Sequence, residues 1–402
     1  MERYLVRDDI YWVGAIDWDI RDFHGYDLTR GTTYNAYLVV DDRVALVDGC
    51  RHGFGEELLA RVSACCGTGQ VDYLVVNHVE PDHSGEVPWL VEKLSPSLVL
   101  CTKRAREALV KYYGADTVDK WPVREVSTGD EVSLGRKTLA FIEAPMLHWP
   151  DSMFTYVKEA KTLLPNDAFG QHLATSKRFA DEVDLHVVME EAGKYYANIL
   201  MPFGGQIQRM LGKIQEMGLA IEAIGPSHGV VWRRPGDVAR IVEAYSRRSS
   251  SQLGERVTLL YDTMWHATER MTRAIAEGVA EEQVDCRILK LSATARSQAA
   301  YEVLESGAFL IGSPTLNNGM FPTVAATLAY LKGLRPKNRI AGAYGSYGWA
   351  GGAVKQIDAE LRTLDLEVVD PVEVRYMPTE GELQTCRELG REVARRVKNR
   401  RG

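Results

Sequence analysis

The six residues from 78 to 83, His-Val-Glu-Pro-Asp-His, concentrate side chains that can bind metal ions. Two imidazoles and two carboxylates directly follow the apolar run 73–76, so the end of an expected strand aims several ligands at one point. Imidazole suits zinc, iron, copper and nickel, whereas carboxylates favour harder ions. The mixture therefore suits iron or manganese at least as well as zinc, and four ligands favour a two-metal site. A solvated polar turn is the alternative interpretation.

Three further candidate ligands, His148, Asp167 and His228, stand singly along the chain, each after an apolar run. One such residue alone is more often a capping or core residue, but three of them in the same region as the first cluster favour metal binding. Seven protein ligands are enough for two metal ions, with Asp167 as a bridging carboxylate and an exchangeable position left open. The complete expected set is His78, Glu80, Asp82, His83, His148, Asp167 and His228.

The first 250 residues must position this cluster, and their pattern is rich in short strands. We expect a helix at 55–65 and a hairpin turn at 41–42, where two aspartates separate two apolar runs. This mixture predicts an α/β sandwich of two sheets. The expected strands are 11–16, 35–40, 43–48, 73–76 and 98–101.

The polar segment 245–254 is the best candidate for a linker, because it is poor in apolar residues. We therefore expect two domains, at 1–250 and 254–402. In the second, five short apolar runs alternate with helical patterns such as 324–333 and 379–398, which predicts a doubly wound parallel sheet. The expected strands are 257–261, 286–291, 308–312, 339–344 and 366–369.

Three loops follow strands of this second domain and predict a flavin site. A hydroxyl-rich loop that opens a helix can bind phosphate, and glycine-rich loops at the carboxyl ends of strands let backbone approach a flat ring. No G-x-G-x-x-G fingerprint follows the first strand, so FMN is preferred over NAD. The loop residues are Thr263, Met264, Trp265, His266, Ala267 and Thr268; Ser313, Pro314, Thr315, Leu316, Asn317, Asn318 and Gly319; and Gly345, Ser346, Tyr347, Gly348, Trp349, Ala350 and Gly351.

Composition narrows the class of protein. A chain of 402 residues exceeds what one core usually fills, and a net charge of −7 gives no sign of nucleic-acid binding. No apolar run approaches the ~20 residues that span a membrane, and the first residues lack the apolar core of a signal peptide. The six cysteines show no CxxC pair and are expected to be reduced thiols of a cytoplasmic protein.

The ligand pattern resembles the metallo-β-lactamase superfamily, whose signature is His-x-His-x-Asp-His. Glu80 stands where that signature has its second histidine. This exchange, together with Asn-Asp-Ala-Phe-Gly-Gln-His at 166–172 and Gly-Pro-Ser-His-Gly at 225–229, resembles the flavodiiron proteins, also called A-type flavoproteins. The resemblance covers essentially the whole chain. It implies a metallo-β-lactamase-like αββα sandwich followed by a flavodoxin-like five-stranded sheet, in the short form without a rubredoxin domain.

The resemblance also implies roles for individual residues. His78, Glu80 and His148 would bind one iron, Asp82, His83 and His228 the other, and Asp167 would bridge them. FMN would lie in the three loops, although His266 stands where many members have a small residue. The family forms a head-to-tail homodimer in which one subunit's FMN faces the other's metals, and the resemblance implies the same here, as a dimer or as a dimer of dimers. Three residues resemble those near the family's diiron site: His24, Tyr26 and Tyr195.

The implied activity is that of an oxidoreductase in which reduced FMN passes electrons to a diiron site. In the family this site reduces dioxygen to water or nitric oxide to nitrous oxide, with electrons from rubredoxin or a reduced deazaflavin coenzyme. The sequence does not choose between the gases or the donors. Two alternatives are a dizinc hydrolase with a metal-bound hydroxide and a simple electron carrier with a structural metal site.

Overall fold

The computed structural model describes residues 2–66, 71–252 and 254–400. Contacts divide the chain into two compact units. The first comprises Met1–His24, Leu28–Tyr195 and Phe203–Ser249, and the second comprises Gly25–Asp27, Tyr196–Pro202 and Ser250–Gly402. Two short segments of the N-terminal half therefore pack with the C-terminal unit.

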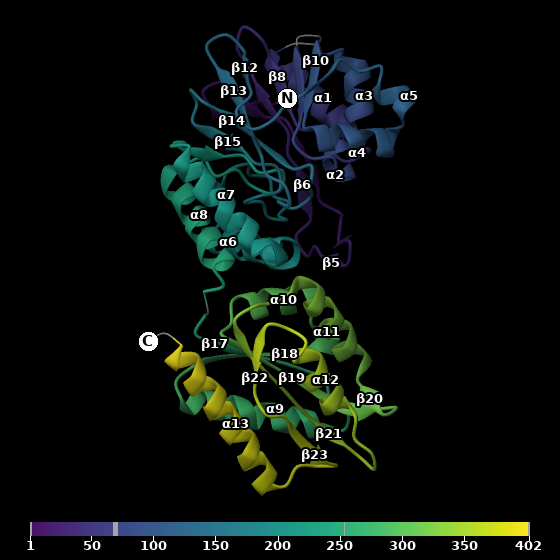
Figure 1. The fold of residues 1–402 in the computed structure, drawn as a ribbon, viewed down its shortest axis with the longest axis vertical. Helices are drawn as coiled ribbons and strands as arrows, with labels where there is room; N and C mark the ends of the chain where they lie inside the picture. Colours follow the sequence, from purple (N-terminus) through teal and green to yellow (C-terminus); the bar gives the residue numbers. More distant parts are fainter. Residues whose placement is uncertain (1, 67–70, 253, 401–402) are drawn as a thin grey trace. The chain divides into compact units, whose positions relative to one another are not determined.

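The first unit contains two main sheets (Figure 1). The first sheet has the order β1 (Tyr4–Arg7), β2 (Ile10–Trp12), β7 (Tyr37–Val39), β8 (Ala45–Val47), β9 (Tyr73–Val76), β10 (Leu98–Cys101) and β11 (Val123–Glu125). The second has the order β12 (Glu131–Ser133), β13 (Thr138–Glu143), β14 (Met153–Val157), β15 (Thr162–Leu164) and β16 (Ala223–Ile224). The remaining strands of the N-terminal half are short: β3 (Ala15–Asp17), β4 (Asp22–Phe23), β5 (Tyr26–Asp27), which belongs to the second unit, and β6 (Thr32–Tyr34).

Strand β9 shows why the first sheet is buried on both faces. Successive side chains of a strand point to opposite faces. Tyr73 and Val75 enter the core between the two sheets, whereas Leu74 and Val76 pack into the core beneath the helices. An uninterrupted apolar run is what such a strand requires. The helices that contribute to the second core are α1 (Gly55–Cys66), α3 (Val87–Leu94) and α4 (Lys103–Tyr113).

Helices also lie against the second sheet, which completes the αββα sandwich. Helices α7 (Gly204–Glu216) and α8 (Pro235–Ser249) pack together, and α8 contacts β16; both helices are seen in Figure 1. The fold class expected for this half is confirmed. Its other helical segments are α2 (Pro81–Ser84), α5 (Ala115–Val118), η1 (Ala180–Glu182) and α6 (Leu185–Tyr195), and the segments that follow α6 are η2 (Tyr196–Leu200) and η3 (Met201–Phe203).

Two sequence predictions in this half were wrong in detail. The strand expected at 11–16 is two strands, β2 and β3, which belong to different sheets. They separate at Gly14, where a Cβ would lie 2.2 Å from the Tyr34 carbonyl oxygen, so the chain passes too closely for a side chain. The linker expected at 245–254 is helical as far as Ser249; residue 253 lies outside the described residues. The hairpin with its turn at 41–42 is confirmed, since β7 and β8 pair antiparallel.

The second unit is built on five parallel strands in the order β18 (Asp285–Lys290), β17 (Arg256–Tyr261), β19 (Ala308–Leu316), β21 (Arg339–Tyr347) and β22 (Leu366–Val368). This confirms the doubly wound parallel sheet. Strand β20 (Gly319–Met320) pairs antiparallel with β19, and β23 (Val372–Arg375) pairs with β21. Strands β19 and β21 extend beyond the expected ends and include the first residues of two flavin loops.

Helices cover both faces of this sheet (Figure 1). On one face, α9 (Ala267–Glu281) and α13 (Glu380–Asn399) share a core with the strands. Thr379 caps α13 in a capping box: its hydroxyl accepts from the Glu382 backbone N–H, and the Glu382 carboxylate accepts from the Thr379 N–H. The remaining helical segments are η4 (Leu291–Ala293), α10 (Arg296–Leu304), α11 (Pro322–Leu334) and α12 (Ala353–Leu361).

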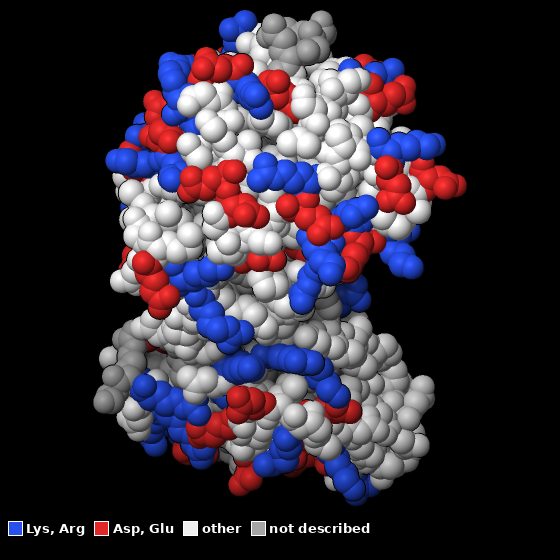
Figure 2. All heavy atoms as spheres, turned by 45° about the horizontal axis from the view of Figure 1, so that its top comes forward, with Lys and Arg blue, Asp and Glu red and all other residues white. Residues whose placement is uncertain are grey.

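The surface carries charges of both signs. Figure 2 shows Lys and Arg side chains intermixed with Asp and Glu side chains, as expected for a modest net charge of −7. Within the part of the chain that the structure describes, no helix combines the length and the apolar character that crossing a membrane requires.

Candidate functional site

The expected metal ligands lie in loops at the ends of strands from both sheets. His78 and Glu80 follow β9 directly, and Asp82 and His83 lie on the short helix α2, whose N-cap is Glu80. Asp167 follows β15, and His228 follows β16. His148 lies further from its strand than expected, within the loop that joins β13 to β14. Stacking the two sheets brings these loops to one edge of the sandwich.

The seven side chains form two groups that could each hold a metal ion. One group is His78, Glu80, His148 and Asp167, and the other is Asp82, His83 and His228; within each, the ligand atoms lie within 4.8 Å of one another. Asp167 stands between the groups. Its Oδ2 lies 3.2 Å from His148 Nε2, and its Oδ1 lies 3.0 Å from His83 Nε2. One carboxylate thus presents an oxygen to each group, as a bridging ligand must.

Several of these ligand atoms are buried and make no hydrogen bond of ordinary geometry in the described structure, although they lie within ion-pair distance of one another. They are His78 Nε2, Asp82 Oδ1, His83 Nε2 and Asp167 Oδ2. Buried polar atoms are normally paired, because leaving one unpaired costs about 1–3 kcal/mol. A pair of cations among these atoms would satisfy all of them. The donor set of imidazoles and carboxylates therefore fits two metal ions, and the carboxylates favour redox-active iron over zinc.

The electrostatics of the site lead to the same conclusion. Burial lowers the pKa of His78, but Asp151 and Glu80 outweigh burial and raise that pKa to about 10. For His148, burial is outweighed by Asp167 and Glu80, which raise the pKa to about 10. Burial raises the pKa of Asp167, yet His83 and His148 hold it well below its ordinary range. Without metal, imidazolium protons balance the carboxylates, so metal binding must release protons.

We predict that the metal-free protein loses stability as pH rises between 6.5 and 10. His78, His83 and His148 have folded-state pKa values of about 10, 9 and 10 against an ordinary 6.5, so the folded state binds more protons than the unfolded state in this interval. Their stabilisation is complete below pH 6.5 and is lost as pH passes the folded-state values. Asp167 acts oppositely, since its contribution is lost toward acid pH, below its ordinary 3.8. Urea unfolding of the metal-free protein across this interval measures the effect.

The iron-loaded protein serves as the control for this prediction. Metal replaces the protons on the imidazoles, so its free energy of unfolding should vary much less over the same interval. A metal-free protein whose stability is constant or rises between pH 6.5 and 10 would contradict the prediction.

Polar groups behind the ligands hold them in place, and sequence reasoning missed most of these. His78 Nδ1 donates to Asp151 Oδ2 at 2.9 Å, and His228 Nδ1 donates to the Thr33 carbonyl oxygen at 2.7 Å. The position after His228 must be glycine: Gly229 has a φ of +78°, and a Cβ there would lie 1.6 Å from Gln171 Oε1. The sequence feature that could have identified Asp151 is its position three residues after the expected ligand His148.

The three residues expected near the metals fall in different places. His24 Nε2 lies 3.4 Å from Glu80 Oε1, and its side chain is 73% exposed. Tyr195 is buried, and its ring centre lies 5.9 Å from that of His228. Burial, with Asp167 nearby, raises the pKa of Tyr195 well above its usual value. Tyr26 lies in the segment Gly25–Asp27, which belongs to the other unit. His172, which is not an expected ligand, lies 2.8 Å from the Thr32 hydroxyl through Nδ1.

The three expected flavin loops come together at the carboxyl edge of the second unit's sheet. The hydroxyls of Thr268 and Ser346 lie 3.1 Å apart, which joins the first loop to the third. The Ala353 backbone N–H donates to Thr315 Oγ1 at 3.2 Å, which joins the second loop to the start of helix α12, directly after the third loop. Trp265 and Trp349 are each 87% exposed, so two large rings stand free beside the loops.

The first loop has the geometry of a phosphate site. Helix α9 begins after His266, which adopts a left-handed conformation and provides no side-chain cap. The first N–H groups of a helix need partners, and an anion is favoured there by the helix dipole. The Thr263 hydroxyl accepts from only one of them, that of Glu269, at 3.3 Å. The loops therefore fit a phosphorylated flavin.

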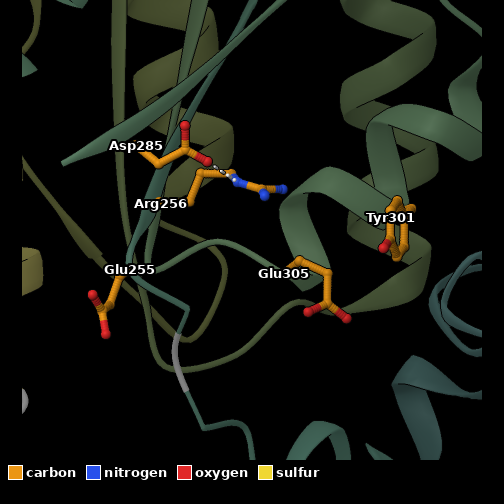
Figure 3. Close-up of a pocket in the computed structure, with 5 residues that line it drawn as sticks. All are labelled: Glu255, Arg256, Asp285, Tyr301 and Glu305. Atoms are coloured by element: carbon orange, nitrogen blue, oxygen red, sulfur yellow. Dashed lines mark hydrogen bonds and ion pairs between the residues drawn. The ribbon is translucent and has the colours of Figure 1, made fainter. Parts of the chain in front are cut away.

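A different hollow on the same unit lies away from these loops. It has a volume of about 240 Å³ and is lined by Glu255, Arg256, Asp285, Tyr301 and Glu305 (Figure 3). It lies at the amino ends of β17 and β18, whereas doubly wound sheets bind ligands at the carboxyl ends of strands. Arg256 is occupied there by Asp285 and Glu302, both at 2.8 Å. This hollow is not the flavin site.

Comparisons with known families agree with this division of the chain. Residues 32–229 match the family described as "ODP family beta lactamase", and residues 259–390 match the family "Flavodoxin". The first match contains all seven expected metal ligands, and the second contains all three expected flavin loops.

Similar proteins cover the chain almost completely. The chain is 49% identical over 396 residues to the "Nitric oxide reductase" of Moorella thermoacetica, covering 98% of each. It is 41% identical to the "Coenzyme F420H(2) oxidase" of Methanothermobacter marburgensis, covering 98% of each. Among solved structures, the rubredoxin oxygen:oxidoreductase of Desulfovibrio gigas matches with a TM-score of 0.95 and 37% identity over 99% of both chains. The flavodiiron protein of Giardia intestinalis matches with a TM-score of 0.95 and 35% identity over 99% of this chain and 97% of that one.

Proposed function

The chain belongs to the flavodiiron protein family, and from this premise we propose which of its residues carry the reductase activity. The protein is an oxidoreductase whose cofactors are FMN and two iron ions, and it passes electrons from the flavin to a diiron site that reduces dioxygen, nitric oxide or both. We assign iron binding to the seven residues of the two groups: His78, Glu80, His148 and Asp167, with Asp82, His83 and His228. We assign FMN binding to loops 263–268, 313–319 and 345–351.

The single observation that supports the iron assignment best is the set of buried, unpaired ligand atoms on both sides of Asp167. When bound, the flavin and the irons supply the redox chemistry, which no side chain here can supply by itself. Asp167 holds the two positions at a fixed separation through its two oxygens. The hydroxyl of Ser227 donates to Asp167 Oδ1 at 2.8 Å and so orients this carboxylate.

Reduction of either gas consumes protons, and we infer that His24 delivers them. Its side chain is largely exposed, while its Nε2 lies 3.4 Å from Glu80 Oε1 at the edge of the metal site. An imidazole that reaches both solvent and a buried carboxylate is placed to pass a proton from one to the other. We give Tyr195 a different role, because its buried ring packs against His172 and excludes water from that side.

We propose nitric oxide as a substrate, supported by the name of the relative with 49% identity. Dioxygen is the second candidate, supported by the names of the oxidase relative and of the Desulfovibrio gigas structure. The electron donor is rubredoxin or a reduced deazaflavin coenzyme, on the same support. We also propose a cytoplasmic location, because each of the six cysteines is a thiol and not part of a disulfide, as in reducing compartments.

We further propose that the protein is a head-to-tail homodimer, alone or as a dimer of dimers. The flavin loops and the metal ligands belong to different units of the chain, and electron transfer needs the two cofactors to be close. A twofold pairing of FMN on one subunit with metal on the other completes two sites at once. The exposed rings of Trp265 and Trp349 support this, since large exposed aromatic side chains are enriched where proteins associate.

Anaerobic turnover with each gas tests the function. The protein is loaded with iron and FMN, reduced by one chemical reductant and supplied with nitric oxide or dioxygen in parallel, with iron content measured on the same sample. Turnover of nitric oxide with about two irons per chain is expected, as a two-metal site requires. Full turnover with zinc and no iron would favour the hydrolase alternative, and iron without turnover of either gas would favour the electron carrier.

We predict that His266→Ala weakens FMN binding several-fold and leaves riboflavin binding unchanged. His266 Nδ1 lies 2.8 Å from Glu269 Oε2, which holds the imidazole ring beside the uncapped start of α9. Solvent screens an exposed contact of this kind, so it contributes at most about 1 kcal/mol, which corresponds to a several-fold change in affinity. Riboflavin lacks the phosphate, so only FMN should lose this contact. Quenching of flavin fluorescence gives both dissociation constants.

Arg273→Ala is the matched control, because Arg273 contacts the same Glu269 from the next turn of the helix. It should bind FMN as the unaltered protein does. If His266→Ala weakens both flavins equally, the side chain supports the loop and does not bind the phosphate.

A further inference from the structure

Asp151 makes a buried contact with one metal ligand that none of the assigned roles explains. Its Oδ2 accepts from His78 Nδ1 at 2.9 Å and from the Val79 backbone N–H at 2.9 Å. The Asp151 backbone is held as well, since Thr102 Oγ1 donates to its carbonyl oxygen at 3.1 Å. Asp151 is 3% exposed. It lies in the same loop as His148, so one loop contributes to the metal group of His78 both a ligand and a carboxylate behind a ligand.

In the described part of the chain, no carboxylate is hydrogen-bonded to Nδ1 of His83 or His228, the histidines of the other group. His228 Nδ1 donates to the Thr33 backbone carbonyl, which is a neutral acceptor. His83 Nδ1 is buried and has no hydrogen-bond partner among the described residues. Within the described residues, the group of His78 therefore has a carboxylate hydrogen-bonded to its histidine, whereas the buried Asp48 acts on His83 through charge alone and accepts no hydrogen bond from its Nδ1. The two metal positions differ in what supports their histidines.

An ionised carboxylate can only accept hydrogen bonds. Asp151 therefore requires the His78 proton to be on Nδ1, which leaves the lone pair on Nε2. That atom faces the metal group, 3.4 Å from Glu80 Oε2 and 3.6 Å from Asp167 Oδ2. The Val79 N–H fixes Asp151 through the backbone next to His78, so ring and carboxylate move together. A carboxylate behind a ligating histidine orients the ring and makes it a stronger ligand.

We propose that Asp151 is a positioning residue for His78, and that it makes the metal position of His78, Glu80 and His148 hold iron more tightly than the position of Asp82, His83 and His228. This inference rests on the proposed iron ligands. Removing such a supporting carboxylate typically weakens metal binding about 10–100-fold. We expect the unaltered protein to lose one iron quickly to a chelator and the other slowly, and the slow step to depend on Asp151.

The test compares iron release from the full-length, FMN-containing protein and its Asp151→Asn and Asp151→Ala variants. Each is loaded anaerobically with iron(II) and then exposed to excess chelator, while iron release is followed in time. Asp151→Ala should speed the slow phase about 10–100-fold. Asp151→Asn keeps a neutral acceptor of similar size and should speed it less. Asp17→Asn is the matched control: this carboxylate accepts from the Tyr34 hydroxyl and touches no proposed ligand, so release should not change.

A second set of variants, made in the His148→Ala protein, shows whether Asp151 acts on His78 alone or on the structure as a whole. In His148→Ala the first position is already weakened, so adding Asp151→Asn should leave release from the remaining position unchanged. A merely structural role would speed release from both positions, and that result would overturn the proposal, as would a slow phase that Asp151→Ala leaves intact. An unaltered protein that binds no iron would instead overturn the ligand assignment itself.

Discussion

Replacing Asp167 by alanine is expected to empty both iron positions and to lower turnover with either gas by at least about 100-fold, more than loss of a supporting residue costs. Asp167 is the one carboxylate that faces both groups, with Oδ1 3.0 Å from His83 and Oδ2 3.2 Å from His148. Without it, each position loses an anionic ligand, and the imidazoles face one another without the charge that separates them. Elemental analysis after anaerobic loading and steady-state turnover measure the two effects.

Asp181→Ala is the matched control for this variant. Asp181 is a buried carboxylate of the same unit that pairs with Arg233 at 2.9 Å and lies outside both metal groups. It should retain both irons and full turnover if it folds, which circular dichroism verifies. An Asp167→Ala protein that keeps both irons and full turnover would show that Asp167 does not bridge the metals.

Mixing two inactive variants is expected to restore about a quarter of the unaltered activity, by the symmetry of a head-to-tail dimer. One variant, His83→Ala with Asp167→Ala, lacks the metals. The other, Ala267→Glu, places a carboxylate in the first turn of α9, where it repels the flavin phosphate. Random exchange makes about half of the dimers mixed, and each mixed dimer has one intact flavin–metal pair of two. Turnover of the exchanged mixture measures the restored fraction.

Each variant alone, taken through the same exchange procedure, must remain inactive for this result to count. Subunit exchange is verified separately by labelling the two variants with different mass tags. If exchange is complete and no activity returns, electrons pass within one chain, and the head-to-tail proposal is wrong. A Trp349→Ala version of the intact protein then tests whether this exposed ring lies at the flavin–metal junction, since its loss should slow electron transfer.

Strands that are buried on both faces were predictable because burial dictates their composition. Strands β9 and β10 were predicted with their observed bounds, since each residue of Tyr73–Val76 must be apolar between two cores. The central parallel strands β17, β19 and β21 were predicted for the same reason, whereas the edge strands β18 and β22 are not buried and were predicted from short apolar runs. Ligand types could be read as well, because metals restrict the side chains that bind them. All seven expected ligands lie together in the structure.

Features that depend on tertiary packing were not predictable. Residues 245–249 look like a polar linker, yet they end α8, where Arg248 and Ser249 are buried with Tyr245. Strands β19 and β21 extend into the loops because Ser313 and Gly345 are buried inside the sheet, where small residues give no strand signal. Asp151 reaches His78 only because the second sheet stacks on the first. No local pattern encodes a contact between residues so distant in the chain.

The ligands come from both sheets, and this has a consequence for the order of events during synthesis. A ribosome delivers the N-terminal ligands His78 to His83 first and His228 last, at about 5–20 residues per second. Until β16 emerges and pairs with β15, the loop that carries His228 has no fixed place, so the second position cannot close. Iron that arrives during translation therefore meets a metal site that still lacks His228. Maturation therefore follows folding, and the finished sandwich must admit iron from outside, at the edge where the exposed ring of His24 stands beside Glu80.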